Sequence, residues 1–199
     1  MYPARFHVVG FPELDALIKP EDASGHLKKL YNKYQQSNET VANILQAHSL
    51  RPHTLEGHMA FFRVVLGHSA NVLPLWFLEA VGVYVSGLNE CEYCIDHHSQ
   101  FGGLAFDGTE KEWSKITEAL LKERPETVFS VPRVSLIHYA GRVTRDPASI
   151  TQSDILALKS AGALDGKILE VNQVAGYFAY ANRTVLGLGI SLSGEIYAE

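Results

Sequence analysis

One apolar segment, LPLWFLEAVGVYVSGL at residues 73–88, most constrains what this chain can fold into. Its apolar residues cover all sides of a helix instead of one face, which is typical of a helix that its neighbours bury completely. Such a segment needs amphipathic partners around it. The segment therefore predicts a helical protein organised around one central buried helix.

The rest of the chain supplies those partners as stretches with apolar residues at helical spacing. These stretches are residues 22–37, 38–50, 53–69, 109–123, 133–145, 151–162 and 165–189. Thr109 and Glu112 form a predicted capping box, and Gly162 occupies a predicted C-cap position. The chain has no Asn-Gly hairpin turn, and period-two alternation never lasts. We predict an all-α fold of roughly seven to nine helices.

The ends of the chain complete the predicted organisation. Residues 1–20 contain three prolines and a mixed apolar pattern, so we expect an irregular N-terminal arm that packs on the body or on another subunit. The length of 199 residues fits one domain, and we predict a single domain over residues 1–199 with the cysteine-containing core at 55–105. The arm and the aromatic-rich last helix offer apolar surface, which favours a homo-oligomer.

Charge and hydropathy exclude several classes of partner. The formal net charge is -5, without the basic excess that binds phosphate backbones, so we expect no nucleic acid partner. The N-terminus lacks the apolar core of a secretory signal, and no uninterrupted apolar run reaches the length of about 18 residues that a spanning helix needs. We therefore predict a cytoplasmic protein that does not enter the membrane.

Both cysteines of the chain lie in NECEYCIDHHSQ, residues 89–100. Asn89 suits an N-cap and Glu92 an acidic partner three residues later, so we expect a helix that begins at about Glu90. Cys91 would then lie in the first turn. Free backbone N–H groups and the helix dipole favour the thiolate there.

Helix geometry separates the two adjacent histidines of this stretch. At about 100° per residue, Cys91, Cys94 and His98 share one stripe, whereas His97 lies well off it. His98 follows Cys94 by one turn and is the predicted acid–base partner, while His97 is expected at the surface or in a supporting position. Two thiols at this spacing can cycle through a sulfenic acid and a disulfide.

Other roles for the cysteine pair are weaker but not all excluded. A structural disulfide would close so small a loop that it would constrain the unfolded chain little. Zinc is a stronger alternative, because the two cysteines with His97 or His98 could supply three ligands, although no fourth completes a closed site. A helical module that binds zinc or senses redox state without turnover therefore stays open. Ile95 follows the second cysteine, which excludes c-type haem attachment.

Two polar positions in apolar helices are also candidates. Glu79 is the only charged residue between Asn71 and Glu90, and a buried carboxylate is costly unless it is paired or protonated. We predict an acid–base role for Glu79; the alternatives are a structural ion pair or a side chain that reaches the surface. Asn182, in the last helix, is predicted to serve a structural network or a subunit contact.

The pattern Glu79, eleven residues, Cys91-x-x-Cys94, three residues, His98 resembles the active-site signature of the AhpD-like alkylhydroperoxidases of the carboxymuconolactone decarboxylase superfamily. Residues 158–183 resemble the longer peroxidase-related branch of that family, so the resemblance covers most of the chain.

The resemblance implies a cofactor-free, thiol-dependent peroxidase without a metal. Glu79, His98, Cys91 and Cys94 would form its proton relay. A small organic hydroperoxide would react at Cys94, and Cys91 would resolve the product and exchange with an external thiol or dithiol reductant. Members of the family are homo-oligomers. Tyr93 stands between the cysteines, where some members carry a histidine.

Overall fold

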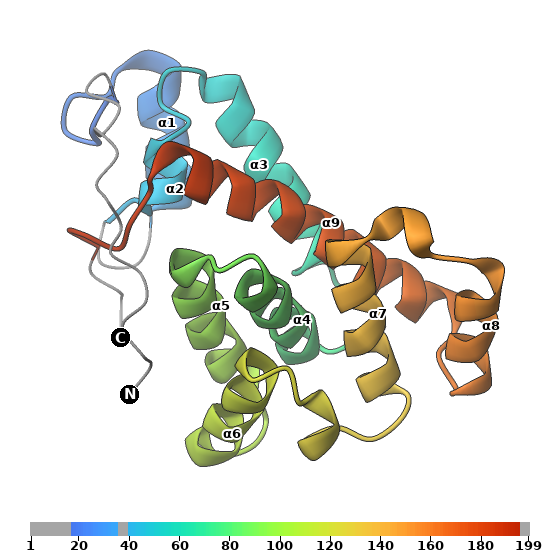
Figure 1. Ribbon diagram of the computed structural model, residues 1–199. Helices are drawn as coiled ribbons and strands as arrows, with labels where there is room; N and C mark the ends of the chain where they lie inside the picture. Colours follow the sequence, from blue (N-terminus) through green and yellow to red (C-terminus); the bar gives the residue numbers. More distant parts are fainter. Residues whose placement is uncertain (1–16, 36–39, 196–199) are drawn as a thin grey trace. The chain divides into compact units, whose positions relative to one another are not determined.

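The structure is a computed structural model, and it describes residues 17–35 and 40–195. Helices are the only regular secondary structure in these described residues, which confirms the all-α prediction (Figure 1). The α-helices are α1 (Gly25–Tyr34), α2 (Asn43–Gln46), α3 (Pro52–Val65), α4 (Leu75–Leu88), α5 (Glu92–Ala105), α6 (Glu110–Leu121), α7 (Arg133–Arg145), α8 (Gln152–Ser160) and α9 (Asp165–Leu188). Two short 3₁₀ helices are η1 (Pro125–Thr127) and η2 (Pro147–Ser149).

The described chain divides into two compact units. One unit contains the described residues up to Met59 together with those from Thr184 onward, and the other contains Ala60–Arg183. The single domain predicted for residues 1–199 stays a prediction. Within the described range, no helix is both long and apolar enough to cross a membrane.

The first unit has a small core of its own. Its buried members are Leu27, Leu30, Tyr31, Val41, Leu45 and Leu55. Most of the predicted N-terminal arm lies outside the described residues, but Ile18 is tied to this core by two hydrogen bonds. The Ile18 N–H donates to Ser49 Oγ (3.0 Å), and Tyr31 Oη donates to the Ile18 carbonyl oxygen (2.9 Å).

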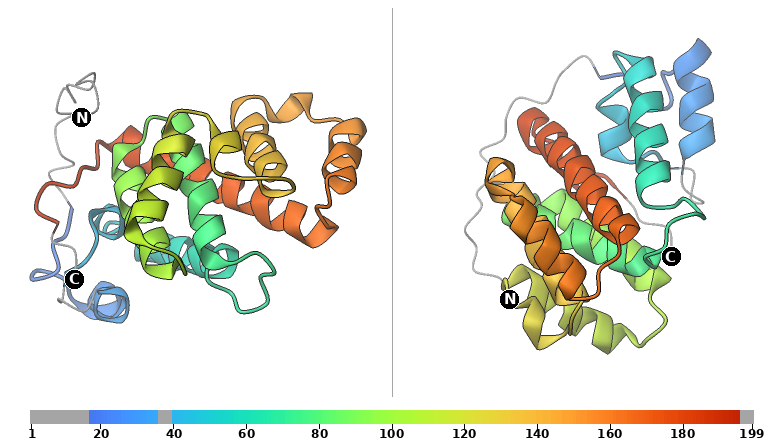
Figure 2. Two further views of the ribbon diagram at one scale, coloured as in Figure 1. Left: turned by 90° about the horizontal axis from the view of Figure 1, so that it is seen from below. Right: turned by 90° about the vertical axis from the view of Figure 1, so that its right-hand side faces the viewer.

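Helix α4 is the centre of the second unit, as its all-round apolar sequence predicts. Every residue from Trp76 to Ser86 is buried, and α5, α6 and α7 pack around the helix (Figures 1 and 2). Helix α9 packs closely on α4 as well. A Cβ atom at Gly82 would lie only 2.3 Å from the ring of Phe178, so glycine is needed for this approach.

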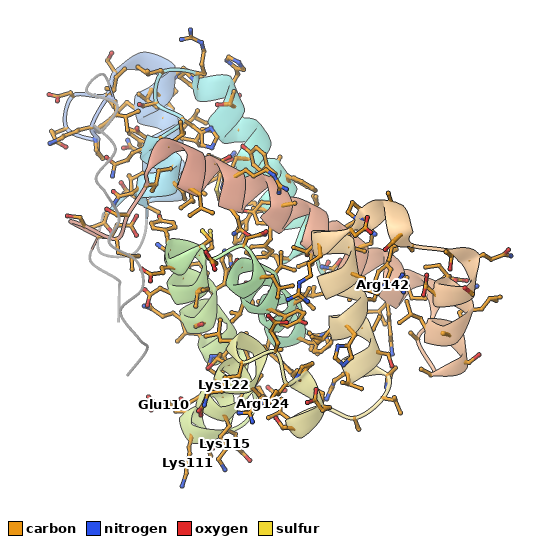
Figure 3. All side chains as sticks on the ribbon, viewed as in Figure 1. Glu110, Lys111, Lys115, Lys122, Arg124 and Arg142 are labelled. Carbon is orange, nitrogen blue, oxygen red and sulfur yellow. The ribbon has the colours of Figure 1, made fainter. Side chains whose placement is uncertain are left out.

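The outer helices of this unit are amphipathic. Helix α6 buries Trp113 and Ile116, while charged side chains such as Lys111 and Lys115 extend from its other face (Figure 3). The predicted capping box of Thr109 with Glu112 is present at its start. The local sequence patterns therefore correctly predict the amphipathic helices that surround α4.

Candidate active site

The corner between α4 and α5 carries the first cysteine, and it is tighter than the sequence predicts. Helix α5 begins at Glu92 with Cys91 as its N-cap, so the predicted start at about Glu90 is wrong. Asn89 is the C-cap of α4 instead of the N-cap of α5. The predicted N-cap is wrong because only three residues separate the end of α4 from the start of α5.

A paired hydrogen-bond motif closes α4 at this corner. The Glu90 N–H donates to the Gly87 carbonyl oxygen (3.1 Å), and the Cys91 N–H donates to the Ser86 carbonyl oxygen (2.9 Å). This is the Schellman arrangement, which requires a left-handed residue after the C-cap. Glu90 supplies it with a φ of 57°, although glycine is the residue that adopts this conformation without strain. The position of Cys91 is thus fixed by backbone bonds on both sides.

Cys91 is the sulfur that carries negative charge most readily. Its pKa is lowered chiefly by a hydrogen bond from Cys94 Sγ, and further by the backbone N–H of Cys94 and the side chain of Asn182, against the opposing effect of burial. The N-cap position also places the sulfur at the positive end of the helix dipole. The sequence predicted a stabilised thiolate here from the start of the helix, and the structure provides the donors.

Cys94 is the sulfur that keeps its proton more firmly. The hydrogen bond with Cys91, burial and the charge of Cys91 raise the pKa of Cys94 far above its usual value. Both cysteines are free and their sulfurs lie 2.8 Å apart, which is longer than the about 2.05 Å of a disulfide bond. The structure therefore contains the reduced pair, with a hydrogen bond between two buried sulfurs.

Glu79 and His98 form a buried pair beside the cysteines. His98 Nδ1 lies 2.6 Å from Glu79 Oε2, and the Glu79 residue is only 2% exposed. The predicted burial of Glu79 is confirmed, and its partner is the histidine one turn after Cys94 instead of an arginine. With a carboxylate on Nδ1, the proton of the ring lies on that nitrogen, and Nε2 becomes the nitrogen that can exchange protons with a reacting group.

Aromatic side chains hold the His98 ring in place. The ring of Phe178 on α9 contacts it edge-on at a centroid distance of 4.5 Å, and Phe101 does so at 5.8 Å. Of the two positions predicted for His97, the surface is excluded. The residue is buried, and its ring lies 4.4 Å from that of Tyr93.

Asn182 joins this site although the sequence predicted only a structural or interface role. Its Nδ2 donates to Ser86 Oγ (3.0 Å), and its Oδ1 accepts a hydrogen bond from Asn89 Nδ2 (2.8 Å). The predicted network is therefore present. As a hydrogen-bond donor the same amide helps to lower the pKa of Cys91, and it opposes, without overcoming, the rise in the pKa of Cys94.

Tyr177 is a second residue that the sequence analysis did not connect with the site. It is buried on α9, and its ring packs against Phe62 (5.9 Å). Burial, followed by the negative charges of Cys94 and Glu79, raises the pKa of Tyr177 well above its usual value. The hydroxyl group therefore stays protonated near these two groups. Because α9 is largely apolar, its sequence did not indicate that Tyr177 shares a face with Phe178 and Asn182.

A largely apolar cavity of about 930 Å³ borders the Glu79 side of the site. Its lining is formed by Phe62, Arg63, Val64, Leu66, Gly67, His68, Ser69, Leu75, Glu79, Phe101, Leu104 and Ala105. Neither sulfur lines this cavity: Cys91 is 0% exposed and Cys94 is 2% exposed. Of the four candidate residues, only Glu79 borders the cavity.

The zinc alternative can be compared with the arrangement of possible ligands. In the part of the chain that the structure describes, no group of three or more His, Cys, Asp or Glu side chains is arranged to hold a metal ion. The Nδ1 atom of His98, one of the ligands that the alternative needs, is bonded to Glu79.

Comparisons with known proteins relate this chain to others through its fold. No family model matches the chain, and no curated protein matches it. A peroxidase-related protein from Silicibacter sp. TM1040 has a similar structure, with a TM-score of 0.70, 22% identity and coverage of 82% of this chain and 83% of that one. An alkylhydroperoxidase AhpD core protein from Ralstonia eutropha JMP134 has a TM-score of 0.73 at 18% identity, covering 90% of this chain and 88% of that one.

The fold is not confined to peroxidase-related proteins. A cysteine-to-alanine variant of the debrominase Bmp8, in complex with 2,3,4-tribromopyrrole, has a TM-score of 0.69 at 13% identity, covering 92% of this chain and 95% of that one. The chain therefore has the AhpD-like fold, and this fold serves more than one chemistry.

Proposed function

We propose that this chain, which shares its fold with AhpD-like peroxidase-related proteins, is a thiol-dependent peroxidase that reduces organic hydroperoxides. The observation that carries the proposal is the buried cluster of a reduced cysteine pair, with sulfurs 2.8 Å apart, and a His98–Glu79 pair at 2.6 Å. Sulfur supplies the electrons of such a reaction, and the histidine supplies and accepts its protons.

In the first step, Cys94 attacks the terminal oxygen of the hydroperoxide. The proton on Cys94 moves to the Cys91 thiolate across the 2.8 Å between the sulfurs, which transfers the negative charge to Cys94. An S–O bond forms and the O–O bond breaks, so that the sulfur is oxidised to a sulfenic acid. His98, one turn beyond Cys94, enters this step protonated on both ring nitrogens, with its charge balanced by the Glu79 carboxylate, and gives its Nε2 proton to the departing alkoxide, which leaves as an alcohol.

In the second step, Cys91 resolves the sulfenic acid. Cys91 gives its proton to His98 and attacks the Cys94 sulfur, an S–S bond forms, and the S–O bond breaks. Hydroxide leaves with the proton from His98 as water. An external thiol or dithiol then returns two electrons and two protons to the disulfide and restores the starting state. We place this cycle in the cytoplasm, where such reductants are maintained.

The surroundings of the acid–base pair support an organic substrate. The cavity next to Glu79 is lined mainly by apolar side chains, among them Phe62, Phe101 and Leu104. Such a lining gains free energy by removing apolar substrate surface from water. Hydrogen peroxide has no such surface, so it would gain nothing from this site.

The experiment is a thiol count on the reduced protein. One equivalent of cumene hydroperoxide is expected to remove both thiols of each chain and to produce one cumyl alcohol, whereas Cys94→Ser should not form the disulfide. Thiols that stay unreactive while stoichiometric zinc co-purifies would overturn the proposal in favour of a zinc-binding module. A screen of dithiol donors then identifies the reductant, and 2,3,4-tribromopyrrole serves as the alternative electrophile.

Adjacent histidines provide a matched control for the relay. His98→Ala removes the partner of Glu79, and we expect at least a hundredfold loss of kcat/KM, in the range of general acid–base catalysis (about 10²–10⁴-fold). Glu79→Gln should lower the rate in the same direction. His97→Ala removes an equally buried ring of the same helix that does not bond to Glu79, and it should retain most activity. Equal activities of the two histidine variants would show that the relay is wrong.

The predicted homo-oligomer stays a proposal as well. Large exposed apolar side chains of the second unit include Val64 and Leu104, at 54% and 85% exposure. Light scattering of the purified protein across a dilution series tests it, and a mass equal to one chain at every concentration would contradict it.

A further inference from the structure

We propose that Asn182 is a catalytic residue, whose side-chain N–H stabilises the negative charge that the two cysteines share. The role rests on the proposed function, because it concerns the sulfurs that would react. It concerns the reduced dithiol itself, however, and can be measured without any hydroperoxide.

The amide of Asn182 is held in a defined orientation by two neighbours. Its Oδ1 accepts from Asn89 Nδ2 (2.8 Å), and one Nδ2 hydrogen is donated to Ser86 Oγ (3.0 Å). A primary amide has two hydrogens on nitrogen, so a second one remains for an acceptor. The cysteines lie beside this amide, because Cys91 follows Asn89 by two residues and its N–H donates to the Ser86 carbonyl oxygen (2.9 Å); as a donor, the Asn182 side chain favours a lower pKa at both sulfurs. The residue is 1% exposed, so water does not compete for this donor.

A donor at this point has a specific chemical use. The two sulfurs lie 2.8 Å apart and both are buried, so once one thiol loses its proton the negative charge lies between two sulfurs inside the protein. Burial disfavours a charged group unless hydrogen-bond donors face it. The backbone N–H of Cys94 serves Cys91, but it does not follow the charge when the shared proton crosses to Cys91. Asn182 reaches both sulfurs and can stabilise the charge on either one.

Two other polar groups near the pair are not altered by a substitution at Asn182. Glu79 on α4 carries negative charge and is paired with His98 Nδ1 on α5 (2.6 Å). Tyr177 on α9 has a pKa raised well above its usual value, first by burial and then by the charges of Cys94 and Glu79. These groups stay in place when Asn182 is changed, so the effect of the amide can be isolated.

The alternative is that Asn182 only ties α9 to the end of α4, and Ser86→Ala is the matched control for it. Ser86→Ala removes the hydrogen bond between the Asn182 amide and α4, but it leaves the Asn182 N–H that faces the sulfurs. Asn182→Asp keeps the size of the side chain and replaces the donor by a carboxylate. Asn182→Ala removes the side chain altogether.

The experiment is a pH titration of the thiolate ultraviolet absorbance in the reduced full-length protein, with thermal unfolding followed by circular dichroism. We expect the thiolate midpoint to rise by about one pH unit in Asn182→Ala, which is roughly tenfold less thiolate at a fixed pH below the midpoint. The rise should be at least as large in Asn182→Asp, while Ser86→Ala should titrate like the unchanged protein. If Asn182→Ala does not fold, Asn182→Leu decides the question, because leucine is similar in size to asparagine and removes the donor without adding a charge.

A second measurement uses the reduction potential of the pair in a dithiothreitol redox buffer. A stabilised thiolate favours the reduced form, so both Asn182 variants should have a lower reduction potential, whereas Ser86→Ala should not. An unchanged titration in the Asn182 variants, or an equal change in Ser86→Ala, would overturn the inference. Failure of the unchanged protein to consume hydroperoxide would instead refute the proposed function and leave this result standing.

Discussion

Replacing Gly82 with alanine tests how closely α4 and α9 must approach to hold the site. Gly82 lies in the middle of α4, and a Cβ atom there would be 2.3 Å from two ring carbons of Phe178. Carbon atoms pack at about 3.5–4.0 Å, so the ring and the helix must separate by roughly 1.5 Å. Phe178 is fully buried and its ring contacts His98 edge-on at 4.5 Å, so a shift of the ring also affects His98.

The energetic cost follows from two opposing effects. Overpacking of a core costs about 1–3 kcal/mol, whereas alanine in place of a helical glycine gains about 1 kcal/mol of helix propensity. We expect the Gly82→Ala variant to lose up to about 2 kcal/mol of unfolding free energy. For a chain of this size that corresponds to a fall in Tm of about 2–4 °C for each kcal/mol. Urea denaturation monitored by circular dichroism measures the change.

The same substitution should also alter the cysteines. Asn182 lies one turn beyond Phe178 on α9, so when the helices separate at Gly82 the amide also moves away from the sulfurs on the other side of the contact. The thiolate midpoint should therefore rise as well, although less than in Asn182→Ala.

Gly176→Ala is the matched control on α9, because no atom lies within 4 Å of the added Cβ. It should gain stability and leave the thiolate titration unchanged. A Gly82→Ala variant as stable as Gly176→Ala would refute the argument from close packing. A destabilised Gly82→Ala variant with unchanged thiols would separate the packing of α9 from the chemistry of the pair.

Two further predictions concern backbone strain and pH. Glu90→Gly should raise the free energy of unfolding by about 0.5–1 kcal/mol in urea denaturation, because glycine adopts the left-handed conformation at φ 57° without strain. Glu123→Gly, at φ 55°, should gain less, because it also loses the ion pair with Arg145. A loss of stability in both variants would contradict this argument. Burial lowers the pKa of His48 below 6.5, so protons bind preferentially to the unfolded chain and stability should fall as pH decreases below about 6.5. His48→Gln should weaken this fall in the urea midpoint, and the exposed His53→Gln should not.

The parts of the site that the sequence predicted are those that local geometry determines. Cys91, Cys94 and His98 fall on one stripe because the helical repeat fixes their relative directions whatever the rest of the fold does. The burial of Glu79 follows from the apolar residues on all sides of its helix. Which group would pair with Glu79 could not be read from the same pattern, since it depends on how α5 lies on α4.

The corner at residues 89–91 was predicted wrongly for a conformational reason. Asn89 is a favourable N-cap residue, and nothing in its identity indicates that it ends a helix instead. The signal that normally marks a helix end is glycine in the left-handed position, but here that position is held by Glu90. Because glutamate rarely adopts this conformation, the sequence does not indicate where α4 ends. The predicted start of α5 was therefore two residues too early.

The proposed role of Asn182 depends on the apolar contact between Gly82 on α4 and Phe178 on α9. The Asn182 amide lies near the sulfurs because α9 approaches α4 at Gly82. There the ring of Phe178 fills the space that a side chain of residue 82 would need. The charge on the dithiol is therefore tied to a packing contact one helical turn away. It follows that substitutions at this contact should change the reactivity of the cysteines even though they add or remove no charge and no hydrogen-bonding group.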